Sequence, residues 1–150
     1  MRTSLLITVL TLAISTIATP TAQAQGQSPL VGAWELTEAT DADGNVIEAT
    51  GMMIFSAGHY TWIRVSDSNR PDYSSQDEAT DAQKVAAFES FGSNAGTYTV
   101  SGSTLTRDPV AAKNPYVYAP DHRIVGDFEI EGRTLTITST RGVETYSRLE

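Results

Sequence analysis

The chain has 150 residues, no cysteine, and 18 acidic against 10 basic side chains, which gives a net charge of -8 at pH 7. This length fits one domain, and the hydrophobic and charged fractions of 40% and 19% fit a folded protein. The acidic balance argues against binding to nucleic acid, which requires clustered lysine and arginine. A chain without cysteine has no disulfides, thiolate metal sites or cysteine nucleophiles.

The first 24 residues have the pattern of a secretory signal peptide. Arg2 provides a positive charge, and an apolar run extends from residue 5 to residue 18. Pro20 follows that run, and Ala22-Gln23-Ala24 has the small residues that signal peptidase recognises. The run is shorter than the roughly 20 residues of a membrane-spanning helix. The pattern predicts an exported protein, periplasmic or secreted, that is cleaved after Ala24 and is not inserted in a membrane afterwards.

After a polar linker at residues 25–29, the sequence consists of short strand-like segments separated by turn residues. Apolar and polar residues alternate with a period of two in several segments, and glycine-containing dipeptides separate many of them. Connections of the hairpin type favour an antiparallel barrel or sandwich. Strands are expected at residues 30–37, 51–56, 59–66, 96–101, 104–107, 124–131, 134–140 and 143–149.

One segment between the third and fourth expected strands predicts a helix. Thr80 and Gln83 have the spacing of a capping box, and Gly92 suits the end of a helix. A stripe of apolar residues recurs every three positions: Ala82, Val85, Phe88 and Phe91. The pattern predicts a helix over residues 81–91 that packs its stripe over a barrel opening, preceded by a mobile polar loop at residues 66–79.

Two motifs near the ends of the predicted domain are typical of lipocalins. Gly32-Ala33-Trp34 looks like the Gly-x-Trp signature of the first strand, and Arg148 lies where lipocalins place an arginine across that tryptophan. A guanidinium over the indole would close the barrel between the first and last strands. Such a contact contributes roughly 0.5–2 kcal/mol.

The chain also resembles the bacterial lipocalin-like domain family over residues 30–150. The matching motifs are Leu30-Val31-Gly32-Ala33-Trp34, Gly58-His59-Tyr60, Arg70-Pro71, Gly96-Thr97-Tyr98-Thr99-Val100 and Tyr146-Ser147-Arg148. The resemblance implies a mainly all-β fold, an eight-stranded antiparallel up-and-down barrel with one inserted α-helix and a central cavity. The sequence departs from the family at Gly126, where an arginine would be expected on the sixth strand. That departure argues against anion binding at that point of the barrel.

Aromatic residues at alternating strand positions predict a cavity for a small hydrophobic or amphipathic molecule. On the third strand Tyr60, Trp62 and Arg64 share a face, although the opposite face could point inward instead. The residues expected to line or gate the cavity are Phe55, Tyr60, Trp62, Arg64, Tyr98 and Phe128. The alternative is that the rings fill an eight-stranded barrel, which would make the protein a structural or interaction module.

No motif predicts a catalytic residue, a cofactor or a metal site, so non-catalytic binding outside the cytoplasm is the expected function. His59 and His122 are far apart in sequence, and a zinc site would need further ligands. The acidic segment 41–45 lacks the EF-hand register and predicts a turn. The rival function is an isomerase or hydratase acting on a lipid-like substrate. It would need a histidine or an inward carboxylate in the cavity with a shifted pKa.

Overall fold

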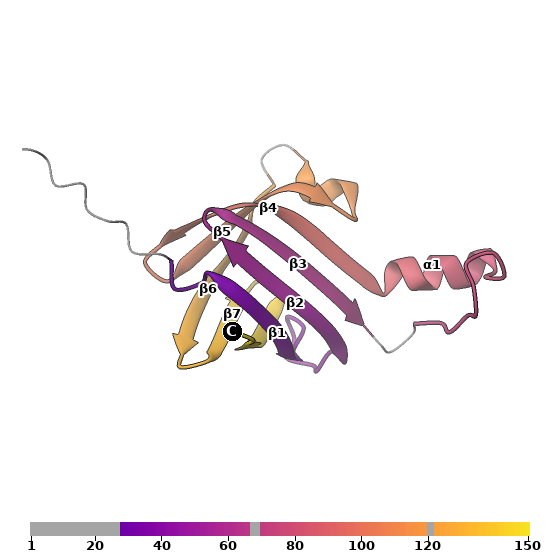
Figure 1. Cartoon of the computed structure of the whole chain (residues 1–150), viewed down its shortest axis with the longest axis horizontal. Helices are drawn as coiled ribbons and strands as arrows, with labels where there is room; N and C mark the ends of the chain where they lie inside the picture. Colours follow the sequence, from indigo (N-terminus) through magenta and orange to yellow (C-terminus); the bar gives the residue numbers. More distant parts are fainter. Residues whose placement is uncertain (1–27, 67–69, 120–121) are drawn as a thin grey trace, which may run out of the picture.

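The computed structural model describes residues 28–66, 70–119 and 122–150. The predicted signal peptide lies outside the described residues. Eight antiparallel strands form a closed barrel in chain order, and one α-helix projects from it (Figure 1). This confirms the predicted fold class, an all-β barrel with one inserted α-helix. No helix within the three described stretches has the length and apolar character needed to cross a membrane.

The elements follow one another with short connections, apart from two insertions. The helix α1 (Asp81–Glu89) lies between β3 and β4, and the short 3-10 helix η1 (Pro115–Tyr118) lies between β5 and β6. The strands are β1 (Gly32–Ala39), β2 (Ala49–Ser56), β3 (His59–Ser66), β4 (Phe91–Ser101), β5 (Thr104–Ala112), β6 (Ile124–Glu131), β7 (Thr134–Ser139) and β8 (Gly142–Arg148).

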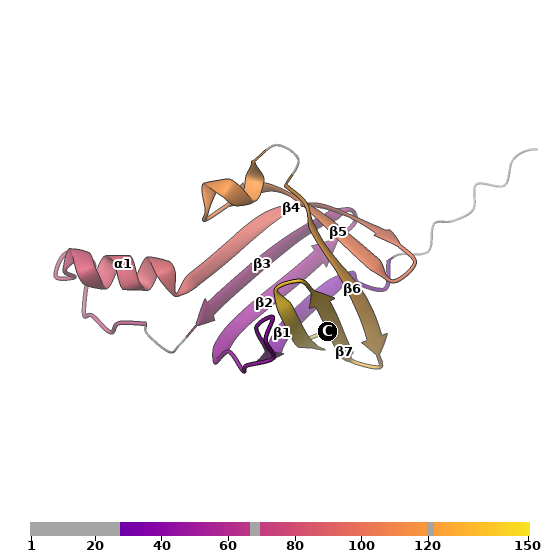
Figure 2. The ribbon, with the colours of Figure 1, turned by 180° about the vertical axis from the view of Figure 1, so that it is seen from behind.

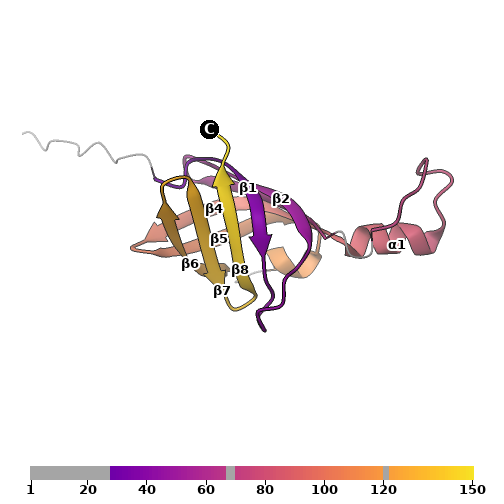
Figure 3. The ribbon, with the colours of Figure 1, turned by 90° about the horizontal axis from the view of Figure 1, so that it is seen from below.

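The barrel closes where β1 pairs with β8, and Figure 3 shows these two strands side by side. Trp34 pairs with Arg148 and Leu36 with Tyr146 in an antiparallel register, which shifts between Leu36 and Glu38. A shift of this kind is a β-bulge, which bends a strand and increases its twist. The first and last strands of the domain are thereby joined by backbone hydrogen bonds.

Two strands, β4 and β5, are each five residues longer than the sequence pattern predicts. β4 begins at Phe91, where the helix was expected to continue, and residues 91–97 all pair with β3. Backbone pairing with a complete neighbouring strand outweighs the weak apolar period of the segment. β5 extends past Arg107 to Ala112, with Pro109 beside the register shift in its pairing with β4. Bulges are positions where a sheet tolerates proline.

The helix begins as predicted but does not cover the barrel. The Thr80 hydroxyl accepts a hydrogen bond from the backbone N–H of Gln83, whose side chain accepts one from the backbone N–H of Thr80, which confirms the capping box. Val85 and Phe88 are 54% and 53% exposed, and no residue of α1 is buried. The expectation that the stripe packs over an opening is therefore wrong. Only Ser90 separates α1 from β4, so the helix extends outward from the start of that strand (Figures 1 and 3).

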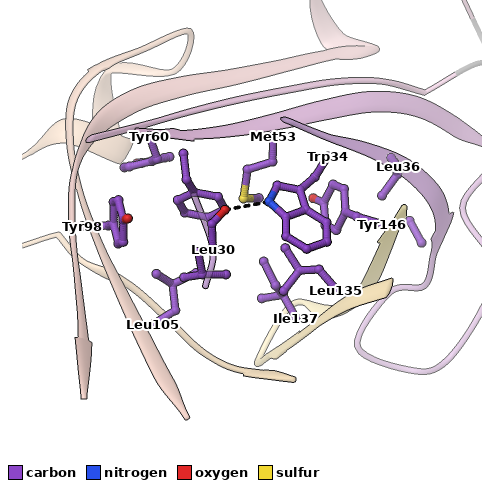
Figure 4. Packing of buried hydrophobic residues seen from close by; sticks show 12 residues of the cluster. Leu30, Trp34, Leu36, Met53, Tyr60, Tyr98, Leu105, Leu135, Ile137 and Tyr146 are labelled. Atoms are coloured by element: carbon purple, nitrogen blue, oxygen red, sulfur yellow. Dashed lines mark hydrogen bonds between the residues drawn. The ribbon is translucent and has the colours of Figure 1, made fainter. Parts of the chain in front are cut away.

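Apolar side chains fill one half of the barrel (Figure 4). Trp34 lies at the centre of this packed core, fully buried, and its indole N–H donates a hydrogen bond to the Leu30 carbonyl at 2.7 Å. The buried members are Leu30, Trp34, Leu36, Ala39, Met53, Phe55, Tyr60, Tyr98, Leu105, Leu135, Ile137 and Tyr146. Many of them lie toward the β2–β3, β4–β5 and β6–β7 turns, so this end of the barrel is closed.

Candidate ligand-binding cavity

A cavity of about 300 Å³ lies toward the other end of the barrel. Its lining includes Ser66 and Ser139 at the ends of β3 and β7, and Phe91 and Gly142 at the starts of β4 and β8. These positions lie opposite the turns that close the packed end. The barrel is therefore filled in one half and hollow in the other, and the cavity volume falls at the lower end of the range for small-molecule sites.

The structure separates the six residues that were predicted to line the cavity. Trp62 and Arg64 lie on its wall. Phe55 and Tyr98 are buried in the packed core with their rings edge to face, 5.0 Å between centroids. The remaining two also belong to or pack against the core and are not among the lining residues: Tyr60 and Phe128. Strand alternation identifies an inward face, but it does not give the height of a residue along the barrel axis.

A polar network joins β3 and β8 on the cavity wall. Arg64 Nη1 lies 3.1 Å from Glu144 Oε1, and the Tyr146 hydroxyl donates to Glu144 Oε2 at 2.7 Å. The Trp62 indole N–H donates to the Tyr146 oxygen at 3.2 Å. Burial raises the pKa of Tyr146, and the neighbouring Glu144 carboxylate raises that pKa further. Both oxygens of the Glu144 carboxylate are thus engaged, one by Arg64 of the wall and one by Tyr146 of the packed core.

Tyr60 and Asn94 link the packed core to the cavity. The Tyr60 hydroxyl donates to Asn94 Oδ1 at 2.7 Å, and both side chains are buried. Burial raises the pKa of Tyr60 to about 12. The phenol therefore remains a hydrogen-bond donor at neutral pH, and Asn94 is held on the cavity wall.

Arg107 is a cavity residue that the sequence reasoning missed. It lies on β5, two positions after the buried Leu105, and is only 7% exposed. Its guanidinium carbon lies 5.6 Å from the centroid of the Tyr60 ring. The signal was present, because a period of two places Arg107 on the same face as Leu105. A charged residue on the apolar face of a strand is an indication of a polar interior site.

The mouth of the cavity is bordered by η1 and the β7–β8 turn. Val117 is buried, while Tyr116 is exposed and its hydroxyl accepts a hydrogen bond from Arg141 at 3.4 Å. Lys113, also at the mouth, donates to the carbonyl oxygen of Phe91 at 2.6 Å. Figure 2 shows η1 above β4, whereas α1 projects outward past the start of β4. The 3-10 helix thus borders the opening with Tyr116 and Val117, whereas α1 contributes its last residue, Glu89, to the lining.

Neither histidine contributes to the cavity wall. His59 is exposed at the start of β3, and His122 lies with its ring 6.1 Å from that of Tyr116. Within the described stretches, no three His, Asp or Glu side chains gather in a way that could hold a metal ion. The predicted turn at residues 41–45 is confirmed, since Asp41 Oδ1 accepts from the backbone N–H groups of Asp43 and Asn45 at 2.9 and 2.8 Å. Hydrogen bonds from Asn45 lower the pKa of Asp41.

Comparison with known proteins found similar folds among solved structures. No protein-family model matches the chain, and no curated protein does. Among solved structures, the chain is similar to a lipocalin-like protein from Bacteroides uniformis, with 14% identity and a TM-score of 0.51, over 80% of this chain and 98% of that one. It is also similar to an uncharacterized protein from Bacteroides eggerthii, with 9% identity and a TM-score of 0.48, over 79% and 98% of the two chains.

The closed barrel of eight strands and the Bacteroides uniformis match together show that this chain has the lipocalin-like fold expected from its sequence. At these identities the similarity concerns the fold alone, and many functions share one fold. The function must therefore be argued from the cavity.

Proposed function

We propose that this protein binds a small amphipathic molecule in the hollow half of its barrel and does not catalyse a reaction on it. The observation that carries the proposal is the cavity of about 300 Å³ above a packed core. A purely structural barrel of eight strands would be filled by side chains along its whole length. The wall combines apolar groups such as Trp62 and Ile124 with polar ones such as Asn94. This mixture suits a ligand with an apolar body and a polar group.

The positions of the titratable groups favour binding over catalysis. The two histidines lie away from the wall, and Glu144 is already engaged by Arg64 and Tyr146. A general base must be free to reach the proton that it removes. Glu89, the other carboxylate of the lining, is exposed to solvent at the end of α1, so the isomerase or hydratase alternative finds no free, buried carboxylate on the described wall.

The proposed location of this binding is outside the cytoplasm. The first 24 residues support export, since they combine a positive charge, an apolar run and an Ala-Gln-Ala site. Amino-terminal sequencing of protein from the periplasm and the medium should find Gln25 as the first residue. Protein that remains in the cytoplasm and retains its first 24 residues would contradict this part of the proposal.

The binding itself is tested by native mass spectrometry of the purified protein. We expect an added mass that is retained under native conditions and released on unfolding. A Ser66→Phe variant places a ring at the mouth of the cavity and should retain less of the added mass. Ser101→Phe is the matched control, because Ser101 is exposed at the packed end of the barrel. Equal retention by both variants would place the molecule outside the cavity, and no added mass together with no displacement of a fluorescent fatty acid would contradict the carrier function.

A further inference from the structure

We infer that the ligand is a small organic carboxylate whose acid group is bound by Arg107. This inference rests on the proposed function and specifies the chemistry of the same cavity.

The first argument is the burial of a charge that lacks a counter-charge. Arg107 is 7% exposed, yet none of the ion pairs and hydrogen bonds within the described parts of the chain involves its guanidinium, and the accessible part of its nitrogens is left to the cavity. An arginine stays protonated in a protein, and burying a charge without a partner opposes folding. The guanidinium faces the cavity, so an anionic ligand would supply the missing partner.

The second argument is the contrast with the other basic groups of the cavity. Arg64 has its own carboxylate, with Glu144 at 3.1 Å. Lys113 is engaged by the carbonyl oxygens of Phe88 and Phe91. Arg107 is therefore the basic group of the wall that is both buried and available to a ligand.

The third argument is the sign of the local charge. The chain as a whole has a net charge of -8, but the cavity is lined by more basic than acidic side chains. The basic ones are Arg64, Arg107, Lys113 and Arg141, and the acidic ones are Glu89 and Glu144. A concave site with an excess of one sign of charge attracts ligands of the opposite sign.

The hydrogen-bond donors of the site favour a carboxylate. The planar guanidinium can donate two parallel hydrogen bonds to a carboxylate. Asn94 accepts from Tyr60 through its carbonyl oxygen, which leaves its NH2 group as a further donor on the wall. Trp62 offers an apolar surface for the body of the ligand, and the volume of about 300 Å³ suits a single ring or a short chain.

The inference is tested by calorimetric titration of the purified protein with three probes of similar size: phenylacetate, its neutral amide phenylacetamide, and phenyl phosphate. Phenylacetate should bind with one molecule per protein, and phenylacetamide roughly 10–100-fold more weakly, because it lacks the charge that pairs with the guanidinium. Equal affinities for phenylacetate and the amide would overturn the inference and leave the carrier function standing. A higher affinity for phenyl phosphate would overturn the assignment to carboxylates. If none of the three binds, the inference fails, and the proposed function fails with it when no molecule co-purifies and no fluorescent fatty acid is displaced.

The variant Arg107→Met separates a binding role from a structural one. It should bind phenylacetate roughly 10–100-fold more weakly, yet unfold at a higher temperature than the unliganded parent, because an unpaired buried charge is replaced by an apolar chain. Arg123→Met is the matched control: it removes one positive charge from the outer wall, where Arg123 pairs with Asp108 and is 65% exposed. The control should keep the affinity of the parent. A lower unfolding temperature for Arg107→Met with unchanged affinity would show a structural role and overturn the inference.

Discussion

Arg148 connects the two ends of the folded domain through three contacts. Its guanidinium carbon lies 4.0 Å from the centroid of the Trp34 ring. Its two terminal nitrogens donate to the carbonyl oxygens of Val31 and Pro29 at 2.9 and 2.7 Å. One side chain on β8 thereby binds both the first strand and the segment that precedes it.

Replacing Arg148 with Met should therefore weaken the closure of the barrel. We expect a loss of about 1–3 kcal/mol, since a cation–π contact and two charge-assisted hydrogen bonds are removed. The free energy of unfolding, measured by urea denaturation, checks this value. Arg141→Met removes the same charge from the exposed β7–β8 turn and should change stability by less than about 1 kcal/mol. A similar loss in both variants would show that Arg148 has no special part in closure.

Gly32 is required by the same contact. Its φ is +135°, and a Cβ added there would lie 2.8 Å from Arg148 Nη1. Gly32→Ala should therefore combine backbone strain with displacement of the guanidinium, at a cost of about 2–4 kcal/mol. Gly44→Ala is the control, because Gly44 also has a positive φ, +85°, but nothing lies within 4 Å of the added Cβ. Urea denaturation should show the larger loss for Gly32→Ala, and equal losses would contradict this explanation.

The closing pair could be predicted from sequence, whereas for the interior arginine the sequence indicates an inward face but not the lack of a paired carboxylate. Trp34 and Arg148 belong to short motifs at the two ends of the domain, and both lie at positions fixed by the pairing of β1 with β8. Arg107 belongs to no such motif. Its significance depends on whether a carboxylate pairs with it in space, and the other walls of the cavity come from strands far away in the sequence.

At the scale of elements, α1 is an appendage of the barrel. Its apolar side chains are half exposed, and Phe88 has the Lys113 Nζ atom 4.0 Å from its ring centroid. The double variant Val85→Ala and Phe88→Ala should therefore cost less than about 1 kcal/mol. Leu135→Ala, in the packed core, should cost about 2–5 kcal/mol. Comparable losses in urea denaturation would show that the helix packs on the barrel in solution.

The start of this helix was readable from local sequence, but its packing was not. The capping box between Thr80 and Gln83 depends on two residues three positions apart. The direction of α1 depends on where β4 begins, and that depends on backbone pairing with β3 over residues 91–97. Such pairing is a long-range property that a local apolar period does not report.

At the scale of the whole molecule, the barrel should lose stability in alkaline solution. Burial raises the pKa of Tyr60 to about 12, and burial with the Glu144 carboxylate raises the pKa of Tyr146. The unfolded chain ionises its tyrosines near their ordinary pKa of about 10, while the folded protein still holds these two protons. Their contribution to stability is complete below about pH 10 and is lost as the pH rises toward about 12.

Urea denaturation at several pH values between about 9 and 11, with the absorbance of tyrosinate as a second signal, checks this prediction. The free energy of unfolding should fall with rising pH, and Tyr60→Phe should make the fall less steep. Tyr116→Phe is the control, because Tyr116 is 57% exposed and should leave the slope unchanged. A free energy of unfolding that stays constant over this range would contradict the burial argument.

The alternating pattern and the turn residues predicted an antiparallel barrel or sandwich, and the family resemblance implied the barrel, whereas neither gave its internal division. Six residues with the same inward character were expected on one cavity wall, but Phe55 and Tyr98 pack together below it while Trp62 and Arg64 line it. Height along the barrel depends on strand tilt and register, which a single sequence does not determine.

The division of the barrel into a packed half and a hollow half means that substitutions in the two halves should have different effects. Substitutions in the packed half should act on whether the chain folds, whereas those around the hollow half should act on the proposed binding of a ligand. A library randomised at Ser66, Asn114 and Ser139, which border the hollow half, should consist mainly of folded proteins with altered preferences. The same barrel could thus come to bind other ligands without first needing stabilising substitutions.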